Sequence, residues 1–520
     1  MPKLTIDNRP VEVLAGATVL DAARRLGIDI PTLCHRAGCT PETSCLVCVV
    51  RINEGKRLLP SCATPAADGM VVESETTEIH QARRTALELL LSDHLGDCLA
   101  PCQTICPAHL DIPNMIRLIS AGRMAEAVSL VKRSIPIPAI LGRICPEICE
   151  RGCRRSDVDA PVSIKLLKRL VGDWDLAQAR PWQPVLPPST GKRIAIIGAG
   201  PAGLSAAYYL RGEGHAVTIF DEREQPGGGL RYGVPAEALE AEVLAAELQA
   251  VLLPGINLQQ GMALGRDLSL ANLIEGFDAV LLACGEITAE QAAALGLPYA
   301  HHGLEVERDS FLTPLDGVFA CGAAVSPSKH AARAVGTGRA AAVSIGRYLH
   351  NGNPTHEGRA FNVHLGKLET SELPGYAAGA SLAARSEARY CLSEEQAGEE
   401  AERCLSCDCA GLAKCRLRHW GARYGADPRA YHSGRRTFER DSSNPCVIYE
   451  SGKCLTCGLC VQIAKRAQEP LGLSFVGRGF SVRIGVPWIE TLAEGLQKVA
   501  AECAAACPSG AIVLKPGAPS

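Results

Sequence analysis

The stretch that most constrains the fold runs from residue 192 to residue 222 and reads KRIAIIGAGPAGLSAAYYLRGEGHAVTIFDE. Residues 193–197 predict a buried strand, an apolar helix follows to residue 210, and a second strand ends at Asp221. Gly198, Gly200 and Gly203 form GxGxxG between the first strand and the helix. These glycines allow a tight turn, close approach of a pyrophosphate and close helix–strand packing, and an acid about 20 residues further on binds ribose hydroxyls. In this context the motif predicts a Rossmann-like dinucleotide site rather than an ordinary Gly-rich turn.

The length and composition of the chain narrow its class. Its 520 residues are enough for several domains with sizeable cores. The 53 Lys and Arg against 56 Asp and Glu leave a formal charge of -3, so neither a nucleic acid nor a membrane surface is an expected partner. We find neither a signal-peptide pattern nor an apolar run of about 18 residues, and therefore expect a cytoplasmic protein without a membrane span. The 24 cysteines then predict metal ligands more than disulfides.

Residues 1–80 combine a hairpin pattern at 3–6 and 11–13 with a short helix predicted at 18–26 and five cysteines. Four of them have the spacing C-x10-C-x2-C-x13-C and suit a [2Fe-2S] cluster: Cys34, Cys45, Cys48 and Cys62. Cys39 is the spare one. The spacing resembles the N-terminal domain of the large iron–sulfur subunit of respiratory complex I and its relatives in NAD-linked hydrogenases and formate dehydrogenases. Zinc is the alternative metal for these thiols.

Residues 81–190 carry two cysteine triplets on either side of an amphipathic helix predicted at 112–133. From residue 97 to residue 170 this pattern resembles the N-terminal domain of the glutamate synthase small subunit and of dihydropyrimidine dehydrogenase. The resemblance implies two [4Fe-4S] clusters whose ligands interleave along the chain. One cluster would be held by Cys98, Cys102 and Cys153, and the other by Cys106, Cys145 and Cys149.

Each of these two clusters lacks a fourth ligand. His94 stands in H-x3-C, which is also how the complex I relatives begin a His/Cys3 cluster, and is our candidate for the first one, although a lone histidine is usually an ordinary residue. For the second cluster the family uses Glu or Gln where this chain has Lys168, and a protonated lysine has no lone pair to give. The fourth ligand there, or the cluster itself, stays open. So does a different partition, in which His94 joins Cys98, Cys102 and Cys106.

Residues 191–350 contain three segments that, together with the GxGxxG stretch, resemble the FAD half of the glutamate synthase small subunit: GGGLRYGVP at 227–235, DAVLLACGE at 278–286 and TPLDGVFACGAAV at 313–325. A helix is predicted after them at 330–349. The resemblance implies FAD bound by Gly198, Gly200, Pro201, Ala202, Gly203, Asp221, Gly228, Gly229, Arg231, Gly322 and Ala323. Ala323 stands where relatives usually place an Asp for the ribityl chain, so FAD is expected to be held differently or more weakly.

A nicotinamide domain is expected to be absent. The family inserts a second Rossmann unit, which binds NADPH, between the ACGE-like strand and the GVFACG-like strand. Here the residues between Gly285 and Gly317 leave room for about one βαβ unit at most and contain no GxGxxG. No Ser/His/Asp arrangement or other catalytic residue is predicted either.

Residues 351–400 are rich in Gly, Ala and Ser and predict a linker that wraps over neighbouring domains, with a solvated charged helix at about 393–403. The spacing C-x2-C-x-C-x5-C follows and suffices for one tetrahedral site, either a [4Fe-4S] cluster or structural zinc: Cys404, Cys407, Cys409 and Cys415. The last segment has a [4Fe-4S] pattern and again resembles the complex I subunit: Cys454, Cys457, Cys460 and Cys507. Cys503 could compete with Cys507, but the Cys-Pro context favours the latter.

The fold class that follows is a multidomain α/β protein. We predict a ferredoxin-like [2Fe-2S] domain at 1–80, a helical [4Fe-4S] domain at 81–190 and a Rossmann-like FAD domain without the NAD(P) domain at 191–350. A linker at 351–400 and a C-terminal iron–sulfur module at 401–520 complete the chain.

The predicted function is electron transfer. One FAD, one [2Fe-2S] and three to four [4Fe-4S] clusters would convert between two-electron and one-electron transfer. We expect a subunit of an NAD(P)-linked oxidoreductase, with a partner that binds NAD(P), a terminal catalytic subunit of the formate dehydrogenase or hydrogenase type, and ferredoxin as a further candidate partner. The flavin could be electron-bifurcating or a simple relay. Two alternatives are a self-sufficient NAD(P)H-dependent reductase of the glutamate synthase small-subunit type, and a scaffold held by zinc with a vestigial flavin domain.

Overall fold

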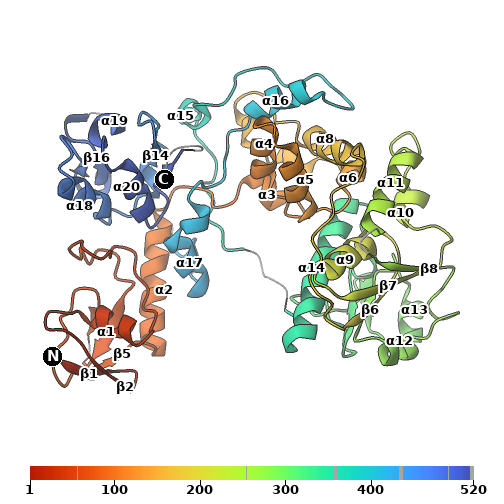
Figure 1. Ribbon diagram of the computed structural model, residues 1–520, viewed down its shortest axis with the longest axis horizontal. Helices are drawn as coiled ribbons and strands as arrows, with labels where there is room; N and C mark the ends of the chain where they lie inside the picture. The colour runs from red at the N-terminus through yellow and green to blue at the C-terminus, as the bar shows by residue number, and fades with distance from the viewer. Residues whose placement is uncertain (56, 253–254, 356–359, 432–436, 490, 516–520) are drawn as a thin grey trace. The chain divides into compact units, whose positions relative to one another are not determined.

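The computed structural model describes residues 1–520 except 56, 253–254, 356–359, 432–436, 490 and 516–520 (Figure 1). The chain divides into two compact units, each built from separate stretches of sequence. Unit 1 comprises Met1–Leu99, Ala360–Ala378 and Asp408–Ser520, and unit 2 comprises Ala100–Arg359 and Gly379–Cys407. Among the described residues, no helix is both long and apolar enough to cross a lipid bilayer.

The N-terminal part of unit 1 is a five-stranded sheet with the order β2-β1-β5-β3-β4. Its strands are β1 (Lys3–Ile6), β2 (Arg9–Glu12), β3 (Val49–Ile52), β4 (Leu58–Pro60) and β5 (Val71–Glu73). The predicted hairpin is confirmed, because β1 and β2 pair antiparallel. The predicted helix is also confirmed as α1 (Val19–Arg25), which starts with a capping box between Thr18 and Asp21. Leu4, Ile6 and Val50 are buried in its core.

The rest of unit 1 joins a long helix to the C-terminal module. Arg83 on α2 (Thr77–Ser92) is fully buried and donates hydrogen bonds to the Val49 carbonyl oxygen and to the Tyr424 hydroxyl. Tyr424 is the residue that follows α17 (Arg416–Arg423). Among its described residues, the module has a three-stranded sheet, a hairpin and three α-helices. These are β13 (Arg440–Asp441), β14 (Val447–Glu450) and β17 (Ile512–Leu514), then β15 (Ser474–Val476) with β16 (Arg483–Gly485), then α18 (Leu459–Arg466), α19 (Leu492–Gly495) and α20 (Ala500–Ala506).

The first part of unit 2 is helical. Its helices are α3 (Pro101–Ile105), α4 (Ile112–Ser120), α5 (Met124–Lys132), α6 (Pro138–Ile144), α7 (Ile148–Arg151) and α8 (Ile164–Leu176). The single helix predicted at 112–133 is wrong, because the chain breaks into α4 and α5 at Gly122, whose φ is +69°. A Cβ at Gly172 of α8 would lie 2.3 Å from the Ala139 nitrogen of α6, so the two helices cross in close contact.

The second part of unit 2 is a parallel sheet with the order β12-β9-β6-β7-β8 (Figure 1). Its strands are β6 (Arg193–Ile197), β7 (Ala216–Asp221), β8 (Asn257–Gln260), β9 (Ala279–Leu282) and β12 (Val318–Ala320). The predicted strand–helix–strand is confirmed as β6, α9 (Pro201–Gly212) and β7, and the helix predicted at 330–349 as α14 (Ala331–Asn351). α14 packs closely on α9, because a Cβ at Gly338 would lie 2.2 Å from the Ala202 carbonyl oxygen.

The stretch between β9 and β12 holds no second Rossmann unit. Residues 283–317 are all described, and they form only α13 (Ala289–Ala294) and a short hairpin of β10 (Tyr299–Ala300) and β11 (Gly303–Leu304). This arrangement agrees with the expectation that no second Rossmann unit is inserted between β9 and β12.

The charged helix predicted at 393–403 is present as α16 (Glu394–Glu402), but its expected full solvation is wrong. Ala397, Glu400 and Ala401 are buried, and α16 packs against α4 and α8 within unit 2. Its acidic residues are therefore divided between a solvated face and a buried one. The buried face attaches residues 379–407 firmly to unit 2.

Candidate iron–sulfur and dinucleotide sites

The four N-terminal thiols that the sequence selects converge in unit 1. Cys34, Cys45, Cys48 and Cys62 are each at most 4% exposed, and the Sγ atoms of Cys34 and Cys45 are 3.3 Å apart. Hydrogen bonds among the four thiols lower the pKa of Cys34 and of Cys48, and the same bonds raise the pKa of Cys45 and of Cys62. Thiolates are the form that binds iron. The four residues therefore fit a [2Fe-2S] cluster.

The C-terminal cysteines surround a small cavity of their own. Its lining includes all four predicted ligands, Cys454, Cys457, Cys460 and Cys507. Cys503 does not line this cavity; it is fully buried and its Sγ contacts the Cys460 carbonyl oxygen at 3.8 Å. The geometry therefore favours Cys507 as the fourth ligand of a [4Fe-4S] cluster.

A second group in unit 1 brings together residues that are distant in sequence. The Cys409 amide donates a hydrogen bond to the Cys98 carbonyl oxygen at 3.2 Å. Burial raises the pKa of Cys415 to about 12, and the thiols of Cys409 and Cys98 raise it as well because they would repel its thiolate. The charge of Lys453 acts on His94 and on Cys98, which places both near the same side chain.

His94 completes this group as the only predicted ligand that is not a cysteine. Its Nδ1 is buried and has no hydrogen-bond partner among the described residues. Burial, and then the charge of Lys453, lower the pKa of His94 to about 4, so that its imidazole is neutral near pH 7. A neutral imidazole with an unused nitrogen is a metal ligand. We therefore group His94 with Cys98, Cys409 and Cys415.

In unit 2, Cys102, Cys153, Cys404 and Cys407 line one cavity. Cys102 lies on α3, Cys153 follows α7, and the other two follow α16. Burial raises the pKa of Cys102, and the neighbouring thiols of Cys404, Cys407 and Cys153 raise it further. Iron would neutralise thiolates that otherwise repel one another in a buried place. These four residues therefore fit a [4Fe-4S] cluster.

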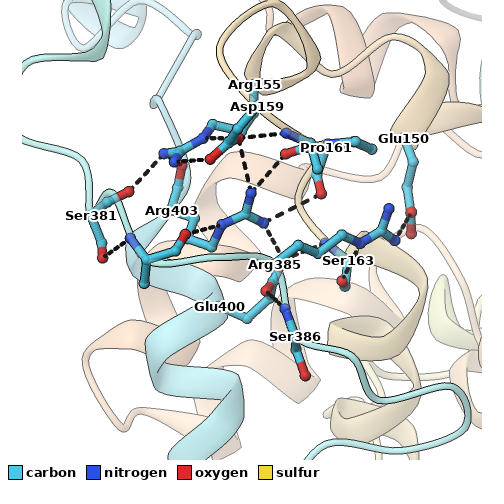
Figure 2. Close-up of polar contacts among 12 residues, drawn as sticks. Glu150, Arg155, Asp159, Pro161, Ser163, Ser381, Arg385, Ser386, Glu400 and Arg403 are labelled. Carbon is cyan, nitrogen blue, oxygen red and sulfur yellow. Dashed lines mark hydrogen bonds and ion pairs between the residues drawn. The ribbon is translucent and has the colours of Figure 1, made fainter.

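Figure 2 shows a network of polar contacts around Arg155 and Arg403, and Arg403 directly precedes Cys404 in the chain. Arg403 is 1% exposed and pairs with Asp159 at 3.0 Å and with Glu400 at 2.8 Å. Arg155 is fully buried, also pairs with Asp159, and donates hydrogen bonds to the carbonyl oxygens of Ser381 and Arg403. Buried charges are tolerated only when they are paired and hydrogen-bonded. The network thus fixes the segment that follows α16 against the helical part of unit 2.

Glu400 extends the network to the start of α8. Its two carboxylate oxygens accept hydrogen bonds from the Ser163 and Ser386 amides at 2.8 and 2.9 Å. Arg385 donates to the Ser163 hydroxyl and pairs with Glu150 at 2.7 Å. Polar contacts therefore join residues 150–163 to residues 385–400, two stretches that are far apart in sequence.

The remaining triplet, Cys106, Cys145 and Cys149, is buried in the helical part of unit 2. Burial raises the pKa of Cys149 to about 12, whereas the charge of Lys168 lowers it. Lys168 is 5% exposed on α8, so it lies close to this thiol. Cys106, Cys145 and Lys168 thus all lie near enough to Cys149 for their charges to act on it, and the predicted cluster at this triplet stays a prediction.

The grouping of the other cysteines differs from the sequence-based one. The structure places Cys98 with Cys409 and Cys415, whereas Cys102 and Cys153 share their cavity with a pair from the return segment. The chain passes from unit 1 to unit 2 after Leu99, visits unit 1 at Ala360–Ala378, and returns to it for the last time after Cys407, so C-x2-C-x-C-x5-C is split in two. The pattern that could have revealed this is H-x3-C followed, after a long insertion, by C-x5-C.

Zinc is not supported at this split motif. Its four cysteines do not meet at one place. Cys404 and Cys407 line a cavity with Cys102 and Cys153, whereas the Cys409 amide donates a hydrogen bond to the Cys98 carbonyl oxygen.

The dinucleotide turn has the conformation that its glycines predict. Gly198 has a φ of +105°, and a Cβ at Gly203 would lie 1.9 Å from the Gly198 carbonyl oxygen. Asp221 ends β7 and accepts hydrogen bonds from the Ala199 amide at 2.5 Å and from the Arg223 amide at 2.8 Å. Its carboxylate is thus fixed beside the turn.

The other predicted cofactor residues surround this turn. Gly228, with a φ of +50°, would bring a Cβ to 2.8 Å from the Gly200 Cα, and Gly229 begins α10 (Gly229–Tyr232). Arg231 of α10 donates a hydrogen bond to the Pro226 carbonyl oxygen at 2.9 Å. A Cβ at Gly322 would lie 2.8 Å from the Ala202 Cβ. Ala202 is the second residue of α9, after Pro201, and Ala323 follows Gly322 in the chain. At Gly228 and Gly322 the lack of a side chain lets these segments pack directly against Gly200 and Ala202 at the start of α9.

Three family models match parts of the chain. Residues 2–77 match the 2Fe-2S iron-sulfur cluster binding domain, residues 75–180 match dihydropyrimidine dehydrogenase domain II with a 4Fe-4S cluster, and residues 196–244 match the NAD(P)-binding Rossmann-like domain. The chain is therefore a mixed α/β multidomain protein with an N-terminal 2Fe-2S domain, a 4Fe-4S domain and a Rossmann-like domain.

Curated relatives match the chain over part of its length. The beta subunit of NADP(+)-dependent formate dehydrogenase from Moorella thermoacetica is 39% identical over 207 residues, which cover 36% of this chain and 29% of that protein. The beta subunit of NADPH-Fe(3+) oxidoreductase from Geobacter sulfurreducens is 40% identical, covering 36% and 28%. The glutamate synthase [NADPH] small chain of Escherichia coli is 35% identical, covering 41% and 45%. The chain spans less than half the length of each of these oxidoreductases.

Proposed function

We propose that this chain is an electron-transfer subunit of a multisubunit NAD(P)-linked oxidoreductase. It would carry one flavin, one [2Fe-2S] cluster and four further iron–sulfur sites. The similarity to a formate dehydrogenase beta subunit and to a glutamate synthase small chain supports this class of function. The abundance of thiols suited to clusters supports a reducing compartment such as the cytoplasm.

The observation that carries the proposal is the position of the cysteines where the chain changes unit. Cys98 and Cys102 lie on either side of the first crossing, and Cys407 and Cys409 lie on either side of the last one. Two residues of extended chain span about 7 Å, and four span about 14 Å. The covalent chain alone thus ties ligands of the His94 group to ligands of the Cys102 group at two points. We infer that electrons pass between these two groups.

FAD is the cofactor we propose for the Rossmann-like domain. The GxGxxG turn would hold its pyrophosphate at the start of α9, and the Asp221 carboxylate is fixed where it can accept ribose hydroxyls. Gly228 and Gly322 would leave the backbone close to the cofactor, and Ala323 offers no carboxylate to it. When bound, a flavin accepts two electrons together and releases them singly.

The partners that we propose follow from the lack of a second Rossmann unit in residues 283–317. Because they form a hairpin and a short helix in place of a second Rossmann unit, a partner subunit would bind NAD(P). A terminal subunit of the formate dehydrogenase or hydrogenase type would complete the reaction, and ferredoxin could be a third redox partner. The alternative, a self-sufficient NAD(P)H reductase, is favoured by the similarity to the glutamate synthase small chain.

The test is an anaerobic titration of the purified chain with NADH, NADPH and dithionite. Visible absorbance reports the flavin, and low-temperature EPR reports the clusters. We expect dithionite to reduce both and neither nucleotide to reduce either. A Gly203→Ala variant, which should lack flavin, serves as the control for the absorbance change. Rapid bleaching of the flavin by one nucleotide would overturn the proposal in favour of the self-sufficient reductase.

A further inference from the structure

Three helix ends deliver the thiols of the remaining triplet to one buried place in unit 2. Cys106 ends α3, Cys145 ends α6, and Cys149 lies within α7. Each is at most 9% exposed and belongs to the same buried cluster of side chains. α8 packs against both α6 and α7 and presents Lys168 from its buried side. The charge of the Glu150 carboxylate also acts on Cys149, but this carboxylate is already engaged by Arg385 at 2.7 Å and by the Lys165 amide at 2.9 Å.

Lys168 differs from the other buried lysines. Lys132 and Lys453 are buried to a similar extent, and each pairs with a carboxylate: Lys132 with Asp175 at 2.5 Å and Lys453 with Glu450. The Lys168 ammonium has no hydrogen bond or ion pair with any other described residue. An unpaired charge in the interior is strongly unfavourable. An anion beside it would offset this cost, and Cys149, on which the charge of Lys168 acts, belongs to the group of thiols that can provide one.

We propose that Cys106, Cys145 and Cys149 bind an iron–sulfur cluster through three thiolates only, and that Lys168 faces the fourth iron as a cation instead of binding it. This inference rests on the proposed function. An ammonium has three donors and no acceptor, so it cannot ligate iron but can donate hydrogen bonds to the anionic cluster. One iron of this cluster then has no protein ligand, in contrast to the sites with four candidate ligands.

An iron without a protein ligand is the one that oxidation removes first. With ferricyanide as the oxidant, a [4Fe-4S] cluster at the 2+ level releases one Fe2+ to solvent and gives one electron to ferricyanide. The three-iron cluster that remains is at the 1+ level and keeps its three Cys–iron bonds. The positive charge of Lys168 favours the more reduced, more negative states of the cluster, so removal of that charge should lower the reduction potential.

The experiment uses the full chain, purified anaerobically and treated with ferricyanide. We expect release of about one iron per chain from this site and the EPR signal of an oxidised three-iron cluster. Lys168→Cys supplies a fourth thiolate and should abolish this signal and the iron release, and Lys168→Glu is the second variant if the first does not fold. Lys165→Gln, on the same helix and paired with Glu147 in the wild type, is the matched control and should behave as the wild type.

The outcomes separate this inference from the proposed function. If dithionite reduces the other clusters but ferricyanide produces no three-iron signal, a protein ligand completes this cluster and the inference fails. Persistence of the same signal in Lys168→Cys would assign it to another site, with the same consequence. A chain that shows no reducible cluster at all would instead overturn the proposed function.

Discussion

Replacing Arg403 by methionine should release the segment that carries Cys404 and Cys407 from the rest of unit 2. Arg403 is 1% exposed, pairs with Asp159 and Glu400, and donates to the Ala383 and Ala160 carbonyl oxygens. Methionine preserves most of the side-chain volume but removes the charge and all of these hydrogen bonds. The Glu400 carboxylate would keep only its two backbone donors.

The expected loss is about 3–5 kcal/mol, which is the usual effect of removing one partner of a buried ion pair. It should appear as local opening of α16, because the network holds the C-terminal end of this helix, which packs against α4 and α8. Since about 1.4 kcal/mol corresponds to tenfold in an equilibrium constant, amide hydrogen exchange in residues 394–402 should accelerate between about 150-fold and 5,000-fold.

The measurement is hydrogen–deuterium exchange of the anaerobically purified chain, resolved to peptides that cover α16. Arg389→Met is the control, because Arg389 is exposed on the same segment and its replacement should leave exchange unchanged. An increase smaller than about tenfold in Arg403→Met would show that the network does not hold the segment. Cys404 and Cys407 would then not be held beside Cys102 by these charges.

Four further predictions concern other parts of the chain. Glu247 accepts hydrogen bonds from the Ala139 and Ile140 amides at 2.7 Å, and burial raises its pKa from 4.5 to about 8. The folded state therefore favours the protonated carboxyl, and this contribution to stability is complete below pH 4.5 and is lost as the pH rises to about 8. The melting temperature of the wild type should accordingly fall relative to that of Glu247→Gln between pH 5 and pH 8, and parallel melting curves would contradict this. Gly203→Ala should remove flavin absorbance, because its Cβ would lie 1.9 Å from the Gly198 carbonyl oxygen, whereas Gly212→Ala, which has open space around it, should retain it. His94→Ala should change the EPR spectrum and potential of one cluster, while His80→Ala, an exposed site paired with Glu75, should change neither. Cys507→Ser should lose the C-terminal cluster and Cys503→Ser should keep it, as iron analysis of both variants will show.

Local features of this protein could be predicted from its sequence because local chemistry decides them. The turn after β6 requires a φ of +105° at Gly198, and at Gly203 a Cβ would collide with the Gly198 carbonyl oxygen. Glycine is the residue that fits both positions. Similarly, closely spaced cysteines such as Cys454, Cys457 and Cys460 lie near one another in any fold. The short section between β9 and β12 also limits, by length alone, what can be inserted there.

Tertiary structure alone decided which distant cysteines meet. Cys98 and Cys409 are brought together because the chain leaves unit 1 and returns to it, and nothing in C-x2-C-x-C-x5-C marks the crossing. The last part of the predicted linker, from Gly379 on, belongs to unit 2 for a related reason, since Arg403 and Glu400 look like solvated charges until their buried partners are known. Spacing along the chain determines contacts over a few residues. Contacts across hundreds of residues depend on burial and on the pairing of charges, which only the folded chain contains.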